Sequence, residues 1–121
     1  MFKKVILLSI IFTLIDSIYL SLMKNNFQKL IKNIQGSDLT LDIPSTIFCY
    51  IFLISSIYYF IIFKNGTIKD AFLLGLFIYG VYETTNAAIF KKWNYKIALI
   101  DTLWGGILFA STIFLLNKIS K

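Results

Sequence analysis

The sequence predicts an all-α protein, an integral membrane bundle of four spanning helices. Of its 121 residues, 58% are hydrophobic, a share well above that of soluble domains. The apolar residues gather in four stretches of about 20 residues, and a helix of that length crosses about 30 Å of hydrocarbon. Lysines stand at the ends of these stretches, where they anchor helices at the lipid headgroups. The lipid bilayer is therefore the first partner that we expect.

The four spans take up most of the chain, so residues 1–121 are expected to form a single membrane domain. Backbone N–H and C=O groups find no water inside the bilayer, and each span must therefore satisfy them internally as a helix. The expected spans are residues 5–23, 44–63, 71–90 and 97–116.

Short signals mark the ends of these spans. No A-x-A-like cleavage site follows the first span, so we expect a retained anchor rather than a cleaved signal. Pro44 suits the first turn of the second span, and Asp42 is expected to cap that helix. Asn65-Gly66 predicts a tight turn between the second and third spans. Between the third and fourth spans, Trp93 is expected at a membrane interface.

The connection between the first two spans carries a helical pattern of its own. Phe27, Leu30, Ile31 and Ile34 recur at the spacing of one helix face, and lysines take the other face. The pattern predicts a short amphipathic helix in the membrane interface, with Gly36 as its stop. The alternative is that the helix of the first span continues and covers the end of the bundle.

Composition excludes several functional classes. The chain has no histidine and one cysteine, Cys49, which excludes an internal disulfide and a Cys/His zinc site. No metal and no other cofactor is expected. The net charge of +6 comes from lysines at the span ends, which favours anionic lipid headgroups and not nucleic acid as the partner. A homo-oligomer or a partner membrane protein stays open.

The lysine count does not decide the orientation in the membrane. Six lysines fall on each side once the spans are laid out. Lys3 and Lys4 precede the first helix, which usually dominates, and they favour cytoplasmic locations for both termini. Such a tie is also expected of a dual-topology antiparallel dimer.

Three acidic residues, Asp16, Glu83 and Asp101, lie inside the expected spans. A charged acid near the bilayer centre costs about 2.5–3.5 kcal/mol, so each is expected to be neutral, paired or required for function. Counted from the nearest lysine, each lies about 7–12 Å from the same membrane boundary. The sequence therefore predicts that the three acids occupy one layer of the bilayer.

Helical spacing adds neighbours to this layer. Tyr79, Tyr82, Glu83 and Asn86 form one stripe of the third span, and Asp101, Trp104 and Gly105 share a face of the fourth. Gly105 is expected to allow a close helix approach. Asp16 shares a face with Tyr19 in the first span, and Tyr50 lies near the same level in the second.

The same residues carry a resemblance to a known family. The pattern Tyr79-x-x-Tyr82-Glu83-x-Thr85-Asn86-x-Ala88, then Trp93, then Asp101-x-x-Trp104-Gly105 is similar to the hallmark of small four-span membrane proteins found largely in bacteria. That family is catalogued as domain of unknown function two-one-seven-seven. Glu83 stands where the family usually has Asp, and Tyr19 where it tends to have Trp. The resemblance implies a four-helix membrane fold without an assigned activity.

The candidate functional residues follow from the layer and the resemblance together. They are Asp16, Tyr50, Tyr79, Tyr82, Glu83, Asn86, Trp93, Asp101, Trp104 and Gly105.

Three functions suit these residues. In the first, the carboxylates form a buried polar network that fixes helix register, with at least one of them protonated because clustered charges repel. Lys92 or Lys96 is a candidate cation for another. In the second, Glu83 and Asp101 serve a small proton-coupled transporter or exporter. In the third, paired carboxylates act as acid and base on a lipid-like substrate, and an enzyme is the least favoured of the three.

Overall fold

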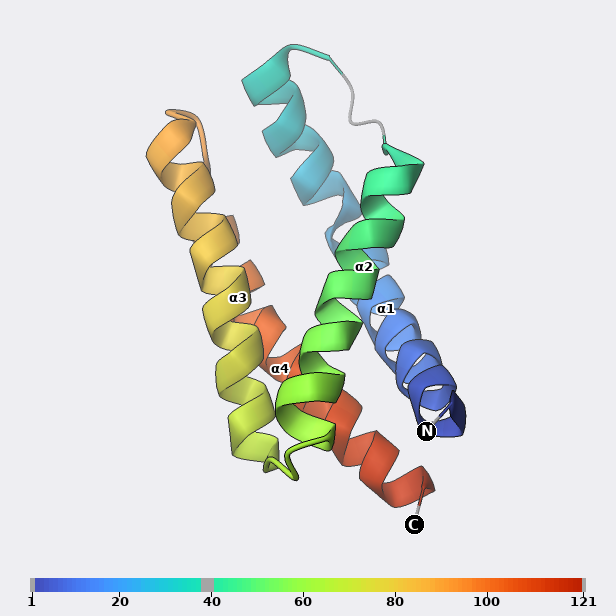
Figure 1. Cartoon of the computed structure of the whole chain (residues 1–121). Coiled ribbons are helices and arrows are strands. Elements are labelled where there is room, and N and C mark those ends of the chain that lie inside the picture. The colour runs from blue at the N-terminus through green and yellow to red at the C-terminus, as the bar shows by residue number, and fades with distance from the viewer. Residues whose placement is uncertain (1, 38–40, 121) are drawn as a thin grey trace.

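The computed structural model describes residues 2–37 and 41–120, and their structure is helical from end to end apart from short connections (Figure 1). The elements are α1 (Phe2–Gln35), α2 (Ile43–Ile57) with its π-helical continuation η1 (Tyr58–Ile62), α3 (Ile68–Ile89) and α4 (Tyr95–Ile119). Four helices, α2 and η1 counted as one, are long and apolar enough to cross a membrane. The expected all-α membrane bundle with four spans is confirmed.

α2, α3 and α4 begin at polar caps that satisfy some of their first N–H groups. Asp42 caps α2 as expected, its side chain accepting from a backbone N–H at 3.2 Å. Thr67 and Asp70 form a reciprocal capping box at α3, with bonds of 2.9 and 3.1 Å. Asn94 caps α4, accepting from two backbone N–H groups at 2.8 and 3.1 Å. Polar side chains favour water over lipid, so we expect these helix starts to lie near the membrane surface.

The turn between η1 and α3 has the residues that its backbone requires. Asn65 has a φ of 55°, in the left-handed region that asparagine tolerates better than most residues. The Gly66 N–H donates to the Ile61 carbonyl at 2.6 Å, and the Asn65 N–H donates to the Ile62 carbonyl at 3.2 Å. The expected tight turn is present.

The expectation of a separate interfacial helix after the first span is wrong. α1 runs unbroken from Phe2 to Gln35, and no glycine or proline interrupts these residues. Its last turns bury Leu30 against Trp93 and Ile97, with Phe27, Ile31 and Ile34 packed around them. The apolar face thus binds protein instead of lipid, and the alternative, a continued helix that covers the end of the bundle, is the structure found. Gly36 ends the helix as expected, with a φ of 78°.

The core is built around α4, which passes behind α2 and α3 in Figure 1. Phe12 of α1, Ile57 of α2, and Leu108 and Phe109 of α4 are fully buried in one cluster. Most other large apolar side chains of α2 are exposed, as lipid-facing residues are in a membrane bundle. α2 therefore contributes little of its apolar surface to the core.

Glycines on two different helices bring α3 and α4 together. A Cβ atom added to Gly75 would lie 2.1 Å from the carbonyl oxygen of Gly105. One added to Gly105 would lie 2.4 Å from Cγ of Tyr79 and 2.6 Å from the carbonyl oxygen of Gly75. The close approach expected at Gly105 is therefore confirmed, and this contact fixes how α3 and α4 meet beside the acidic residues.

Candidate functional site

Asp16 joins three helices through one carboxylate. It lies in α1 and is 5% exposed. Its Oδ2 accepts a hydrogen bond from the hydroxyl of Tyr50 in α2 at 2.5 Å, and its Oδ1 accepts from Nε1 of Trp104 in α4 at 3.1 Å. Both donors carry aromatic rings that also pack in the core. One buried acid thus ties α1 to α2 and to α4.

Asp101 makes the second connection between α1 and α4. It is 6% exposed, and its Oδ1 accepts from the hydroxyl of Tyr19 at 2.9 Å. The Tyr19 ring stacks on the Trp104 ring, with centroids 4.4 Å apart and planes 4° apart. Since Trp104 donates to Asp16, the stacked pair connects two of the acids. Tyr19 was not among the candidate residues, although its spacing from Asp16 places it on the same face.

Glu83 is the most deeply buried acid of the layer, at 1% exposure. Its Oε1 accepts from Nε1 of Trp93 at 2.8 Å, whereas its Oε2 has no hydrogen-bond partner among the described residues. The Asp101 carboxyl is near enough to Glu83 for the two acids to interact electrostatically. Two carboxyl groups can form a hydrogen bond only when one of them carries a proton. The pair is therefore suited to hold a proton between α3 and α4.

The side chains that donate to the three acids in the described chain are uncharged tyrosines and tryptophans. Lys92 and Lys96, the cations considered from the sequence, are both exposed, and Trp93 between them donates to Glu83. Uncharged donors offset less of the cost of a buried charge than a cation does.

The remaining candidate residues lie around the layer without donating to it. Tyr79 is half-buried and packs edge-on against Phe109, with ring centroids 6.3 Å apart. Tyr82 is 56% exposed on α3, and Asn86 lies within hydrogen-bonding reach of its hydroxyl. Gly105 acts as the spacer between α3 and α4. The structure thus brings together Asp16, Tyr50, Glu83, Trp93, Asp101 and Trp104. It leaves Tyr82 exposed and Asn86 half-buried on α3.

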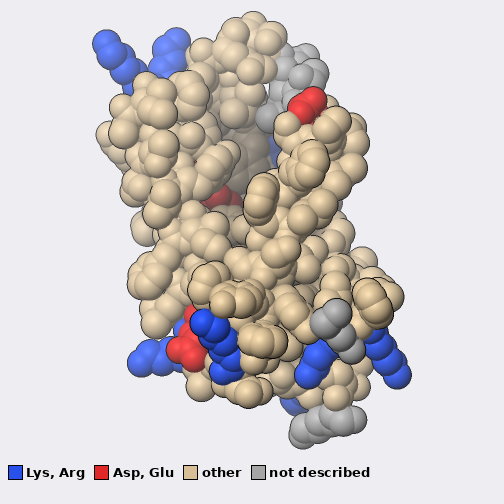
Figure 2. Space-filling view, viewed as in Figure 1, with Lys and Arg blue, Asp and Glu red and all other residues tan. Residues whose placement is uncertain are grey.

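A lateral hollow leads toward this layer. In Figure 2 the hollow lies between α2 and α3, below the end of α1, and acidic surface forms part of its floor. The other described acids, Asp42 and Asp70, cap helix ends, so this surface belongs to the buried layer. Within residues 2–37 and 41–120, no group of three or more His, Cys, Asp and Glu is placed to hold a metal ion.

Comparison with known proteins gives a family match. A family model with the description "Predicted membrane protein (DUF2177)" matches residues 1–115. No curated protein and no solved structure matches the chain.

Proposed function

The chain belongs to the DUF2177 family of predicted membrane proteins, and we propose that its buried carboxylates form a proton-binding site that exchanges its proton for an organic cation. The observation that carries the proposal is the burial of Glu83, which is 1% exposed and has one oxygen without a donor among the described residues. The buried carboxyl of Asp101 interacts with it electrostatically.

Electrostatics favours one proton in this pair. Two like charges about 4 Å apart repel by roughly 4 kcal/mol at an effective dielectric constant of about 20. Glu83 accepts a hydrogen bond from Trp93, and Asp101 accepts one from Tyr19. Neither donor carries a charge. A shared proton removes the repulsion and supplies the donor that the pair lacks. The pair is therefore expected to be singly protonated in the resting protein.

A cation that takes the place of this proton would keep the pair neutral. The hollow between α2 and α3 offers a route from the lipid to the acidic floor (Figure 2). Next to Asp101 lie the stacked rings of Tyr19 and Trp104, and aromatic faces attract organic cations. We propose a hydrophobic organic cation as the exchanging species, because it reaches the hollow through the membrane.

The competing function is a structural one. The same hydrogen bonds join α1 to α2 and α4, and polar contacts of this kind contribute about 0.6–2 kcal/mol each inside membranes. In that case the layer fixes helix register and holds its proton permanently. The two functions differ in whether a bound cation releases the proton.

The test measures proton release when a cation binds. Purified protein in detergent and a weakly buffered solution is titrated with tetraphenylphosphonium while a pH indicator is read. We expect release of about one proton per protein, and none from Glu83→Gln or Asp101→Asn. Asp42→Asn is the matched control, because it removes an acid outside the layer and asparagine still caps a helix. Wild-type protein that binds the cation without releasing a proton would leave only the structural function.

A further inference from the structure

The two ends of the span formed by α2 and η1 pack differently on the rest of the bundle. In residues 43–49, every residue is exposed except Thr46, which is half-buried. In Figure 1 this first part of α2 stands apart from α3 and α4. From Ile57 onward the helix enters the core, where Ile57 is fully buried and Ile61 is 3% exposed. A movement of the first part of α2 would therefore leave the core contacts in place.

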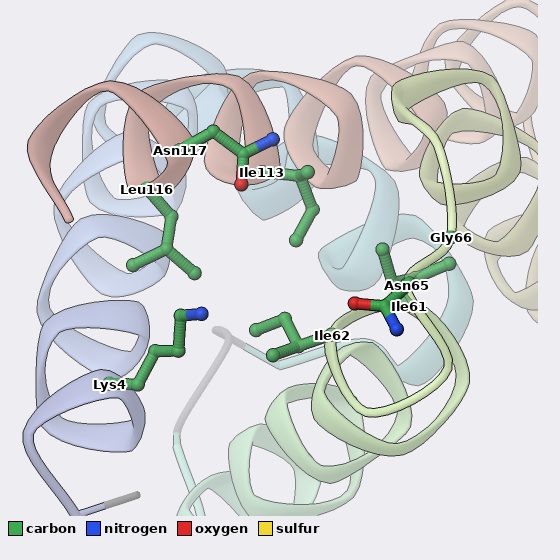
Figure 3. Close-up of a pocket in the computed structure, with 8 residues that line it drawn as sticks. All are labelled: Lys4, Ile61, Ile62, Asn65, Gly66, Ile113, Leu116 and Asn117. Atoms are coloured by element: carbon green, nitrogen blue, oxygen red, sulfur yellow. The ribbon is translucent and has the colours of Figure 1, made fainter. Parts of the chain in front are cut away.

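The other end of the span is anchored by α4 and by the turn before α3. Figure 3 shows Ile61 and Ile62 of η1 pointing toward the same space as Ile113 and Leu116 of α4, around a pocket of about 190 Å³. Ile61, Ile113 and Leu116 belong to one buried cluster. The Ile61 carbonyl also accepts from the Gly66 N–H at 2.6 Å. We therefore expect this end of the span to stay fixed.

One hydrogen bond holds α2 at the level of the acidic layer. The Tyr50 hydroxyl donates to Asp16 at 2.5 Å, and the Tyr50 ring packs edge-on against Phe12, with centroids 5.9 Å apart. Among the described residues, no other side chain of α2 forms a hydrogen bond with another helix, because the remaining bonds return to the α2 backbone or to its cap. Loss of this single bond is therefore expected to release the first part of α2.

A pair of serines lies between this bond and the buried end of α2. The Ser56 hydroxyl donates to the backbone carbonyl of Leu53 at 2.7 Å, and Ser55 beside it is exposed. Serine hydroxyls that bond back to the backbone weaken a helix and often bend it. The helix then changes at Tyr58 to the wider π form, which occurs frequently at functional sites. The serine pair is therefore the expected pivot of the span.

We propose that residues 43–54 form a lateral gate of the hollow between α2 and α3. The bond from Tyr50 to Asp16 is its latch, and the serine pair is its pivot. When the latch is lost, the first part of α2 tilts away from α3 and widens the hollow seen in Figure 2. The gate regulates access to the acidic layer and in this respect rests on the proposed function.

The size of the movement follows from helix geometry. At about 1.5 Å per residue, Cys49 lies about 10 Å along the helix from Ser56. A kink of about 20° at the serine pair would therefore move Cys49 by about 3–4 Å.

The test measures the position of α2 with pairs of spin labels on the purified full chain in detergent, without any cation. One label is attached to the native Cys49, which is exposed, and the other to Val81→Cys, at a position of α3 that is 66% exposed. Electron paramagnetic resonance gives the distance between the labels. We expect Tyr50→Phe to add a population in which this distance is about 3–4 Å longer.

The matched control moves the first label to Phe63→Cys in a Cys49→Ala background. Phe63 follows η1 and is 66% exposed, so its distance to the label at residue 81 reports on the anchored end and should not change in Tyr50→Phe. Longer distances from both positions would show that the whole span loosens. An unchanged distance from Cys49 would show that the bond to Asp16 is no latch. Either result would overturn the gate.

The pivot is tested in the Tyr50→Phe background. The double change Ser55→Ala and Ser56→Ala should reduce the long-distance population, because alanine is the best helix former. An undiminished population would overturn the serine pair as the pivot.

The gate and the exchange of a proton for a cation can fail separately, because the spin-label measurement contains no cation. Proton release from wild-type protein without a longer distance in Tyr50→Phe would support the exchange and overturn the gate. A longer distance without proton release would support the gate and leave the structural function for the acids.

Discussion

Tyr19 and Trp104 lie with their rings parallel and 4.4 Å apart, yet each donates its hydrogen bond to a different acid. The Tyr19 hydroxyl binds Asp101, and the Trp104 indole binds Asp16. The stacked pair thus connects two carboxylates that come from α1 and α4. Any change to one ring is expected to affect the acid that the other ring binds.

This coupling can be measured with the variants Tyr19→Phe and Trp104→Phe. Tyr19→Phe removes the bond to Asp101 and keeps the stacked ring, and we expect it to lower the free energy of unfolding by about 1–2 kcal/mol. The double variant is expected to deviate from additivity by about 0.5–1.5 kcal/mol, because the rings are in contact. Unfolding by sodium dodecyl sulfate in mixed micelles gives these values. Additive effects would show that the stack does not couple the two acids.

Tyr50→Phe is expected to loosen α2. Among the residues of α2 only Ile57 is fully buried, so the bond from Tyr50 to Asp16 is a large part of what holds this helix at the level of the layer. We expect a loss of about 1–2 kcal/mol in the free energy of unfolding. Tyr59→Phe is the control, because Tyr59 is 50% exposed. Equal losses for both variants would contradict the role assigned to Tyr50.

Two glycine substitutions are expected to have opposite effects. Gly105→Ala places a methyl group 2.4 Å from Cγ of Tyr79, and overpacking of this kind costs about 1–3 kcal/mol. Gly80→Ala places it 3.5 Å from Cγ2 of Thr102, an ordinary contact, and should stabilise the helix by up to about 1 kcal/mol. Thermal unfolding in detergent compares the two. A tolerated alanine at Gly105 would show that α3 and α4 can separate there.

The orientation of the chain can be read by cysteine labelling in a Cys49→Ala background. Both termini and the turn at Asn65 lie at one end of the bundle in Figure 1, and the end of α1 lies at the other. We propose that both termini face the cytoplasm. A membrane-impermeant maleimide added to intact cells should then label Ser37→Cys and leave Ser120→Cys unlabelled. The reverse pattern would invert the orientation, and equal labelling of both would indicate dual topology.

The spans and the burial of the acids were predictable, because hydropathy and the cost of a charge in lipid can be read from local sequence alone. Asp16, Glu83 and Asp101 are all buried in the structure, as the cost of a charge in lipid requires. The pairing of donors and acids was not predictable. Tyr19 shares a helix face with Asp16, yet it donates across the bundle to Asp101, and periodicity does not tell which helix lies opposite.

Tyr82 and Gly75 show two further limits of the sequence. The stripe on α3 put Tyr82 beside Glu83, but the structure leaves Tyr82 56% exposed and Glu83 1% exposed. A polar stripe identifies a face without showing which of its edges points inward. Gly75 allows the backbone of α3 to approach Gly105 on α4. A search for paired glycines within one helix does not find a contact between two helices. The continuation of α1 depended on a packing surface around Trp93 that exists only in the folded bundle.

The long α1 helix has a consequence for how molecules reach the acids. At about 1.5 Å per residue, its 34 residues span about 50 Å, well beyond the hydrocarbon thickness of about 30 Å. Its final turns pack on Trp93, which donates to Glu83, so these apolar turns cover the acid from that end of the bundle. A molecule that reaches the layer through the lateral hollow must first dissolve in the bilayer. Its occupancy of the site would then follow its membrane–water partition coefficient more closely than its aqueous concentration.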